Sequence, residues 1–155
     1  IIAVEDEELI VNFLDILENH KMLVENSGLL TVAALKHLDC KGKRVVSILS
    51  GGNMDIITLS SVVQHGLIAR GRVFTVAVQL PDRPGELVNV ADIIAKEKGN
   101  VIRLEHNQFV SINRNAAVEL RITLEAFGQE HKNEILKALR DKGYDAKEET
   151  PTGMY

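Results

Sequence analysis

The chain has 155 residues, of which 45% are hydrophobic and 26% are charged, and its formal net charge is -4. This composition is typical of a globular protein with one large core or two small ones, and it excludes intrinsic disorder. The acidic balance and the absence of tryptophan argue against a nucleic-acid-binding surface. No apolar run approaches the roughly 20 residues of a membrane span, and the single cysteine, Cys40, fits a reducing cytoplasm.

Helix and strand patterns alternate in residues 1–68. Apolar residues at helical spacing predict helices over residues 6–19, from Asn26 or Ser27 to an end near residues 39–43, and from Asp55 to about residue 65. Residues 1–4 read as a strand, and the β-branched run 44–49 predicts another that ends at Ser50, Gly51, Gly52 and Asn53. Strand, glycine turn and helix in succession indicate an α/β layer.

A different pattern occupies residues 72–149. Alternating apolar residues predict strands over residues 74–80, 101–108, 118–124 and 144–149, with a turn at Asn113–Asn115. Helices are predicted after the turn of residues 81–85 and over residues 129–142, where Gly143 ends the second one. The predicted order is βαββαβ, which is the ferredoxin-like arrangement with two helices on one face of a four-stranded antiparallel sheet. The fold class is therefore α/β followed by α+β.

The residues Asp82-Arg83-Pro84-Gly85-Glu86-Leu87 resemble the signature that opens ACT domains, the amino-acid-sensing modules of metabolic enzymes. The segment Gly99-Asn100-Val101 is similar to the start of their second strand. The resemblance implies a regulatory domain over residues 72–149. It also implies that Asp82, Arg83, Pro84, Gly85, Glu86, Leu87 and Asn100 form an effector site at a subunit interface.

The upstream half resembles the last part of the catalytic domain of threonine dehydratases, a family of fold-type II pyridoxal phosphate enzymes. The resemblance rests on residues 5–8, 21–28 and 45–53, although relatives read V-E-G-A-G where this chain has Val24-Glu25-Asn26-Ser27-Gly28. We therefore expect a C-terminal fragment, with residues 1–68 as the remnant of a catalytic domain. The catalytic lysine and the phosphate loop would lie upstream of Ile1, so the fragment itself is expected to be inactive and to bind no cofactor.

The resemblance also implies a cofactor contact and partners. In the intact enzyme, Ser50 would face the ring nitrogen of pyridoxal phosphate, and Gly51, Gly52 and Asn53 would complete that segment. The expected effector is a small amino acid such as isoleucine or valine, held between the N–H groups of residues 85–87 and the side chains of Asp82 and Asn100. We expect those two side chains to lie close together in one chain. A homo-oligomer is expected through pairing of sheet edges, with no nucleic acid and no membrane as partner.

Simpler interpretations remain open for each element. The segment of residues 50–53 can be an ordinary tight turn, Asp82 can cap a helix, Arg83 can be a solvated turn residue, and Asn100 can simply follow a helix end. The histidines lie far apart in sequence, which favours solvated or capping roles over metal binding; they are His20, His37, His65, His106 and His131. Two other functions also fit the sequence: a stand-alone amino-acid-binding module without enzyme activity, and a serine-specific dehydratase of the same fold.

Overall fold

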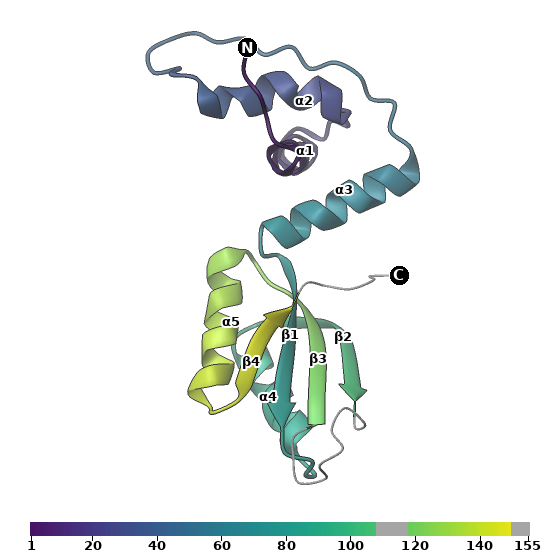
Figure 1. Cartoon of the computed structure of the whole chain (residues 1–155), viewed down its shortest axis with the longest axis vertical. Helices are drawn as coiled ribbons and strands as arrows, with labels where there is room; N and C mark the ends of the chain where they lie inside the picture. The colour runs from purple at the N-terminus through teal and green to yellow at the C-terminus, as the bar shows by residue number, and fades with distance from the viewer. Residues whose placement is uncertain (108–117, 150–155) are drawn as a thin grey trace. The chain divides into compact units, whose positions relative to one another are not determined.

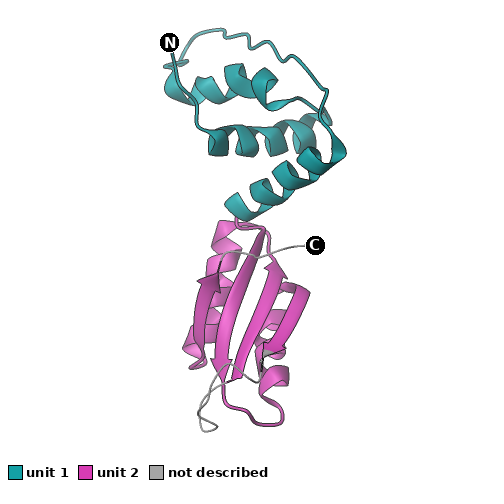
Figure 2. Cartoon of the chain, turned by 45° about the vertical axis from the view of Figure 1, so that its right-hand side comes forward, with its two compact units in different colours: residues 1–69 teal, residues 70–155 magenta. Residues whose placement is uncertain are grey.

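A computed structural model describes residues 1–107 and 118–149 of the chain. The chain divides into two compact units, residues 1–69 and residues 70–155 (Figure 2). Each unit has its own cluster of buried apolar side chains.

Helices make up all the regular structure of unit 1 (residues 1–69) (Figure 1). They are α1 (Asp6–His20), α2 (Asn26–Ala33), the 3₁₀ helix η1 (Ala34–His37) and α3 (Ile56–Ala69). Helix α1 begins with three acidic residues, which complement the positive end of the helix dipole. The buried core of the unit consists of Leu9, Phe13, Ile16, Val24, Leu29, Ala33 and Val62.

The α/β prediction for residues 1–68 is wrong at its predicted strands. Residues 44–49 have no regular secondary structure and pair with no strand, and residues 1–4 are also irregular. Val46 is 88% exposed and Ile48 is 73% exposed. A β-branched run becomes a strand only when a neighbouring strand pairs with its backbone, and no described residue of unit 1 does so.

Helix α2 holds part of residues 44–49 through two hydrogen bonds of Thr31. Thr31 Oγ1 donates to the Ile48 carbonyl at 2.9 Å, and Ser47 Oγ donates to the Thr31 carbonyl at 3.3 Å. Two helix bounds also differ from the prediction, because the α-helical part of the second helix ends at Ala33 and the third continues to Ala69.

Unit 2 (residues 70–155) confirms the predicted βαββαβ order in its described residues. Its elements are β1 (Val73–Leu80), α4 (Glu86–Lys96), β2 (Asn100–Asn107), β3 (Val118–Glu125), α5 (Gln129–Asp141) and β4 (Asp145–Glu149). The strands form one sheet in the order β2-β3-β1-β4, and every neighbouring pair is antiparallel. The predicted turn at Asn113–Asn115 lies outside the described residues.

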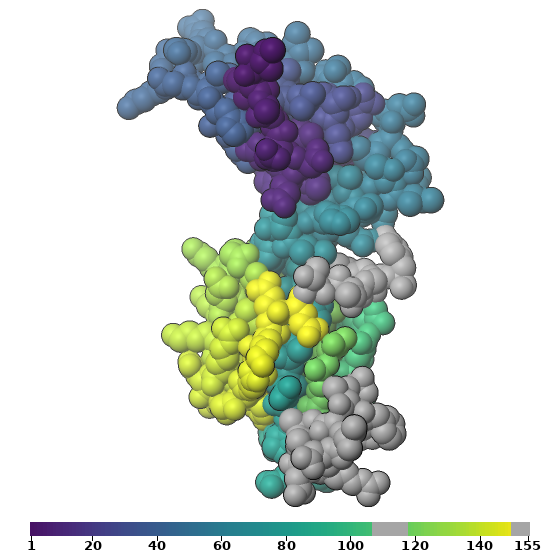
Figure 3. All heavy atoms as spheres, viewed as in Figure 1, coloured from purple at the N-terminus to yellow at the C-terminus, as the bar shows by residue number. Residues whose placement is uncertain are grey.

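The core of unit 2 lies between the sheet and its two helices. Alternate residues of β1 and β3 point to the helices, and they pack with buried residues of α4 and α5, among them Val76, Val78, Ile122, Ile94 and Leu139. Figure 1 shows α4 behind the sheet, and Figure 3 shows side chains of β3 and β4 at the surface of the opposite face. On that face, Thr75 and Thr123 pair through their hydroxyl groups at 2.9 Å.

Both helices of unit 2 end in a Schellman motif. For α5, Gly143 takes a φ of 89° while its N–H bonds Arg140 O, and the N–H of Tyr144 bonds Leu139 O at 3.2 Å. This confirms the predicted end of the helix at Gly143. For α4, Lys98 takes the left-handed position with a φ of 63°, and the N–H of Gly99 bonds Ile94 O at 2.9 Å.

We predict that Ile122→Ala lowers the free energy of unfolding of unit 2 by about 2 to 5 kcal/mol, because the side chain is removed from the centre of the core. Val88→Ala is the matched control, since Ile122 is 1% exposed and Val88 is 68% exposed. Urea unfolding of the two variants measures the difference. Equal effects would contradict the assigned core.

Candidate functional site

The structure brings together the two segments of unit 1 that the sequence singled out. The backbone N–H of Glu25 donates to Gly51 O at 3.2 Å. A Cβ atom added at Gly28 would lie 1.6 Å from Ser50 O, and one added at Gly51 would lie 2.3 Å from the carboxyl carbon of Glu25. Residues 24–28 and 50–52 therefore pass close to one another, and a side chain at Gly28 would collide with the backbone of Ser50, whereas one at Gly51 would displace the Glu25 side chain.

This contact explains the glycines without any ligand. Gly51 also has a φ of +75°, which an L side chain rarely adopts. The interpretation of residues 50–53 as a tight connection is thus consistent with the structure. Ser27, which stands where relatives have alanine, also has a structural role. Its Oγ donates to Glu25 Oε1 at 2.6 Å and so restrains the carboxylate beside Gly51.

Ser50 and Asn53 are exposed, and neither side chain forms a hydrogen bond or ion pair with any described residue. The Ser50 hydroxyl can therefore donate to, or accept from, a group outside the described chain. The Asn53 amide can do the same, and both side chains belong to the predicted cofactor segment.

The predicted effector loop, residues 81–85, connects β1 to α4 and is exposed throughout. The residue that caps α4 is Gly85, with a φ of 96°, so the interpretation of Asp82 as the helix cap is wrong. Glycine is favoured there because the backbone turns through the left-handed region. The side chains of Asp82 and Arg83 form no hydrogen bond or ion pair with any described residue.

Two N–H groups in the first turn of α4 remain available, in addition to that of the preceding Gly85. The N–H of Glu86 bonds Arg83 O at 3.3 Å, and the N–H of Asn89 bonds Gly85 O at 3.0 Å. The N–H groups of Leu87 and Val88 donate to no described residue, as is usual in the first turn of a helix. An anionic group can bind there.

Asn100 does not lie near Asp82 in the same chain, so the expected proximity is wrong. In the sheet, Glu125 of β3 is the partner of both Asn100 and Val73, which begins β1. Strands β1 and β2 therefore start at the same end of the sheet, whereas the effector loop follows Leu80 at the other end. Over the length of β1 the separation is roughly 24 Å, at about 3.4 Å per residue. Asn100 Nδ2 instead donates to Glu125 Oε2 at 3.2 Å.

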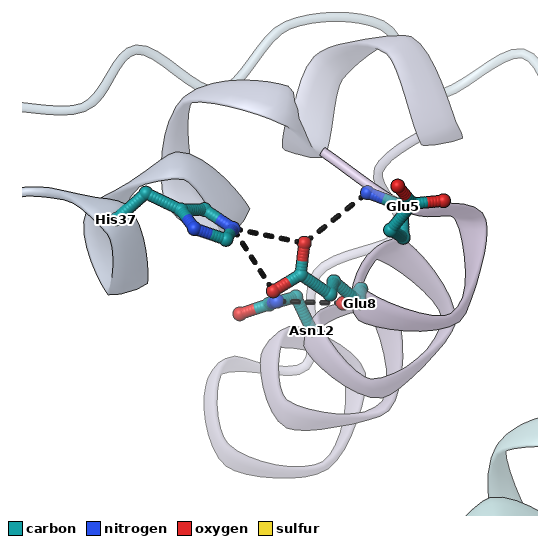
Figure 4. A network of polar contacts seen from close by, with 4 residues as sticks. All are labelled: Glu5, Glu8, Asn12 and His37. Carbon is teal, nitrogen blue, oxygen red and sulfur yellow. Dashed lines mark hydrogen bonds and ion pairs between the residues drawn. The ribbon is translucent and has the colours of Figure 1, made fainter. Parts of the chain in front are cut away.

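A polar network at the start of α1 was missed in the sequence (Figure 4). Glu8 accepts from the backbone N–H of Glu5 at 3.1 Å, and both of its carboxylate oxygens lie 3.0 Å from His37 Nε2. Asn12 Nδ2 donates to Glu8 O at 2.6 Å. The hydrogen bond from His37, followed by that from Glu5, lowers the pKa of the Glu8 carboxyl. The contact between His37 and Glu8 joins η1 to α1. Because these two residues are 29 positions apart, no local sequence pattern reveals the contact.

No helix in residues 1–107 and 118–149 has the length and apolar character needed to cross a bilayer. No group of three or more His, Cys, Asp and Glu side chains in those ranges could hold a metal ion.

Comparisons with known proteins point to one enzyme family. The chain is 38% identical over 147 residues to the L-threonine ammonia-lyase of Geobacter sulfurreducens, and 33% identical over 147 residues to that of Thermotoga maritima. These matches cover 93% and 94% of this chain, but only 36% and 37% of the two enzymes. The chain is thus related to threonine ammonia-lyases and spans a little over a third of the length of these curated relatives.

The chain was also compared with family models and with solved structures. No family model matches the chain. Among solved structures, the ACT domain of prephenate dehydrogenase from Bacillus anthracis is 22% identical with a TM-score of 0.37, and the match covers 47% of this chain and 99% of that domain.

We predict that Gly28→Ala destabilises unit 1 by about 1 to 3 kcal/mol or more, because the added Cβ meets a backbone carbonyl that cannot rotate away. Gly52→Ala is the control, since its added Cβ would lie 3.2 Å from Leu23 O and needs only a small adjustment. Thermal unfolding followed by circular dichroism compares the two. If Gly28→Ala were the milder change, the packing of residues 24–28 against Ser50 would be wrong.

We predict that Glu8→Gln lowers stability at neutral pH and that this loss shrinks in acid. The folded-state pKa of Glu8 lies below the ordinary value of 4.5, so its contribution is present above pH 4.5 and disappears as the pH falls through the lowered pKa. Glu7→Gln is the control because Glu7 is also a first-turn acid of α1. Melting temperatures over a pH series test this, and a loss for Glu8→Gln that persists in strong acid would contradict it.

Proposed function

We propose that the chain is the C-terminal part of a threonine dehydratase, an enzyme that converts threonine to 2-oxobutanoate and ammonia. Residues 1–68 would be the end of its catalytic domain, and residues 72–149 its ACT regulatory domain. The observation that carries this proposal is the alignment with two threonine ammonia-lyases, which runs through both units. The alternative of a stand-alone binding module does not explain why residues of unit 1 also align with these enzymes. The alternative of a serine-specific dehydratase differs from the proposal only in its substrate.

The exposed β-branched run of residues 44–49 supports the assignment of residues 1–68. Val46 and Ile48 are apolar, β-branched and exposed, although such residues are usually buried in sheets. A strand separated from its sheet neighbours has these properties. In the proposed enzyme, the remainder of the catalytic domain would supply the missing strands and cover these side chains.

The intact enzyme would use pyridoxal phosphate, which stabilises the carbanion formed when the substrate loses a proton. The donor set of unit 1 fits one contact with this cofactor. The Ser50 hydroxyl is exposed and has no described partner, so it is free to bond a cofactor atom. Ser50 would hydrogen-bond the ring nitrogen, and Asn53 would border the same segment.

Unit 2 would bind a small amino acid, with isoleucine or valine as the expected effector. Its carboxylate would accept hydrogen bonds from the N–H groups of Leu87 and Val88, which have no described partner. The exposed Asp82 carboxylate would face its ammonium group. Arg83, Pro84 and Gly85 would shape the loop between these two contacts.

Asn100 could contribute to the effector site around Asp82 only from a second subunit, because the register of the sheet places it at the opposite end of its own chain's sheet. Strand β2 is at the edge of the sheet, and Val101 and Ile102 at its start are 41% and 51% exposed. If two copies pair antiparallel through β2 about a twofold axis, the start of one β2 lies beside the end of the other. The partner's Asn100 would then lie at the end of the sheet that carries Asp82. The proposed assembly is a cytoplasmic homo-oligomer whose effector sites are shared between subunits.

We predict that isothermal titration of the chain with isoleucine or valine gives binding, and that Asp82→Ala weakens it about tenfold or more through loss of a charge-assisted contact. Glu130→Ala, which removes an acid from the exposed face of α5, is the control and should bind as the unaltered chain does. No heat at millimolar ligand would exclude effector binding. Serine and threonine assays on the full-length enzyme would separate the two dehydratase alternatives.

A further inference from the structure

Tyr144 links the end of α5 to the beginning of α4. The Schellman motif fixes its backbone, because its N–H bonds Leu139 O at 3.2 Å directly after Gly143. Its ring is partly buried against the core of unit 2. Its hydroxyl donates to Glu86 Oε2 at 2.9 Å. The turn after α5 thus fixes the backbone of Tyr144, and its hydroxyl bonds the first residue of α4.

The bond to Tyr144 determines where the Glu86 carboxylate lies. Tyr144 borders a groove of about 530 Å³ between α4 and α5, whose α4 wall includes Asn89, Ile93 and Lys96. Glu86 lies three residues before Asn89, so the two residues share this face of α4. The carboxylate is therefore drawn toward α5.

An unrestrained Glu86 would have a different partner. An acidic side chain in the first turn of a helix is attracted to the free N–H groups there and to the positive end of the helix dipole. The N–H groups of Leu87 and Val88 have no described acceptor, although a carboxylate is next to them in sequence. That carboxylate is instead bonded to Tyr144.

We propose that Tyr144 is a positioning residue that holds the Glu86 carboxylate away from the N–H groups of Leu87 and Val88, and so leaves them open to the carboxylate of a ligand. This inference rests on the proposed effector function of the same loop. In this inference Glu86 is not a ligand contact. Its carboxylate would compete with the ligand for the two N–H groups, and the bond to Tyr144 prevents this competition. Burial and the nearby Glu86 carboxylate raise the pKa of the Tyr144 phenol, which therefore remains a donor at neutral pH.

Four variants of the full chain test the proposal: Tyr144→Phe, Glu86→Gln, the double variant, and Asp92→Asn as control. The control removes an exposed carboxylate from the same helix that pairs with Lys96 rather than with the first turn. Nuclear magnetic resonance of the Leu87 and Val88 amides reports their acceptors without any ligand. We expect these two resonances to move in Tyr144→Phe and to return toward their original positions in the double variant.

Titration with isoleucine then tests the consequence for binding. Tyr144→Phe should weaken binding about two- to fivefold, the range expected when a carboxylate competes at a helix N-terminus, and the double variant should recover it. A purely structural role for Tyr144 would give no recovery, because Glu86→Gln cannot restore the missing hydroxyl.

The outcomes separate this proposal from the function on which it rests. Unchanged Leu87 and Val88 resonances in Tyr144→Phe would overturn the positioning role whether or not isoleucine binds. Shifted resonances without isoleucine or valine binding to the unaltered chain would overturn the effector function and retain the placement of Glu86. Weaker binding in Tyr144→Phe that the double variant fails to recover would also overturn the positioning role.

Discussion

The register of β3 between β1 and β2 determines how an effector site can form in this protein. Glu125 of β3 is the common partner of Val73 and Asn100, which places the starts of β1 and β2 at one end of the sheet. The loop that carries Asp82 and the open N–H groups of α4 lies at the other end. One chain alone therefore provides only half of the predicted site. The proposed dimer through β2 would bring the Asn100 of a second subunit to that end.

The two units differ in how completely they bury their apolar side chains and cap their helices. Unit 2 has a sheet, two helices and a continuous core, and both helices end in complete capping motifs. Unit 1 has a smaller core of helices and leaves Val46, Ile48, Ile56 and Ile57 largely exposed. This contrast supports the proposal that unit 1 is the end of a larger domain and that unit 2 is a domain with its own core.

The fold of unit 2 was predictable from sequence because its signals are local. Period-two alternation, a Pro-Gly turn and Gly143 each act within a few residues, and all four strands and both helices were found. The strand predicted at residues 44–49 failed because strand formation depends on distant partners. The predicted proximity of Asn100 and Asp82 was avoidable, because the helix between β1 and β2 returns the chain to the end of the sheet where β1 starts, and the two strands therefore run parallel. The Glu8–His37 and Glu86–Tyr144 contacts join residues 29 and 58 positions apart and have no local pattern.

Subunit complementation tests the shared effector site most directly. Asp82→Ala and Asn100→Ala chains would be prepared separately, mixed under conditions that exchange subunits, and titrated with isoleucine. Each mixed dimer then has one site with both residues intact, so random exchange should restore about a quarter of the original sites. If the mixture binds no better than either variant alone, Asp82 and Asn100 do not meet across a subunit interface, and the account of this protein as a shared-site sensor is contradicted.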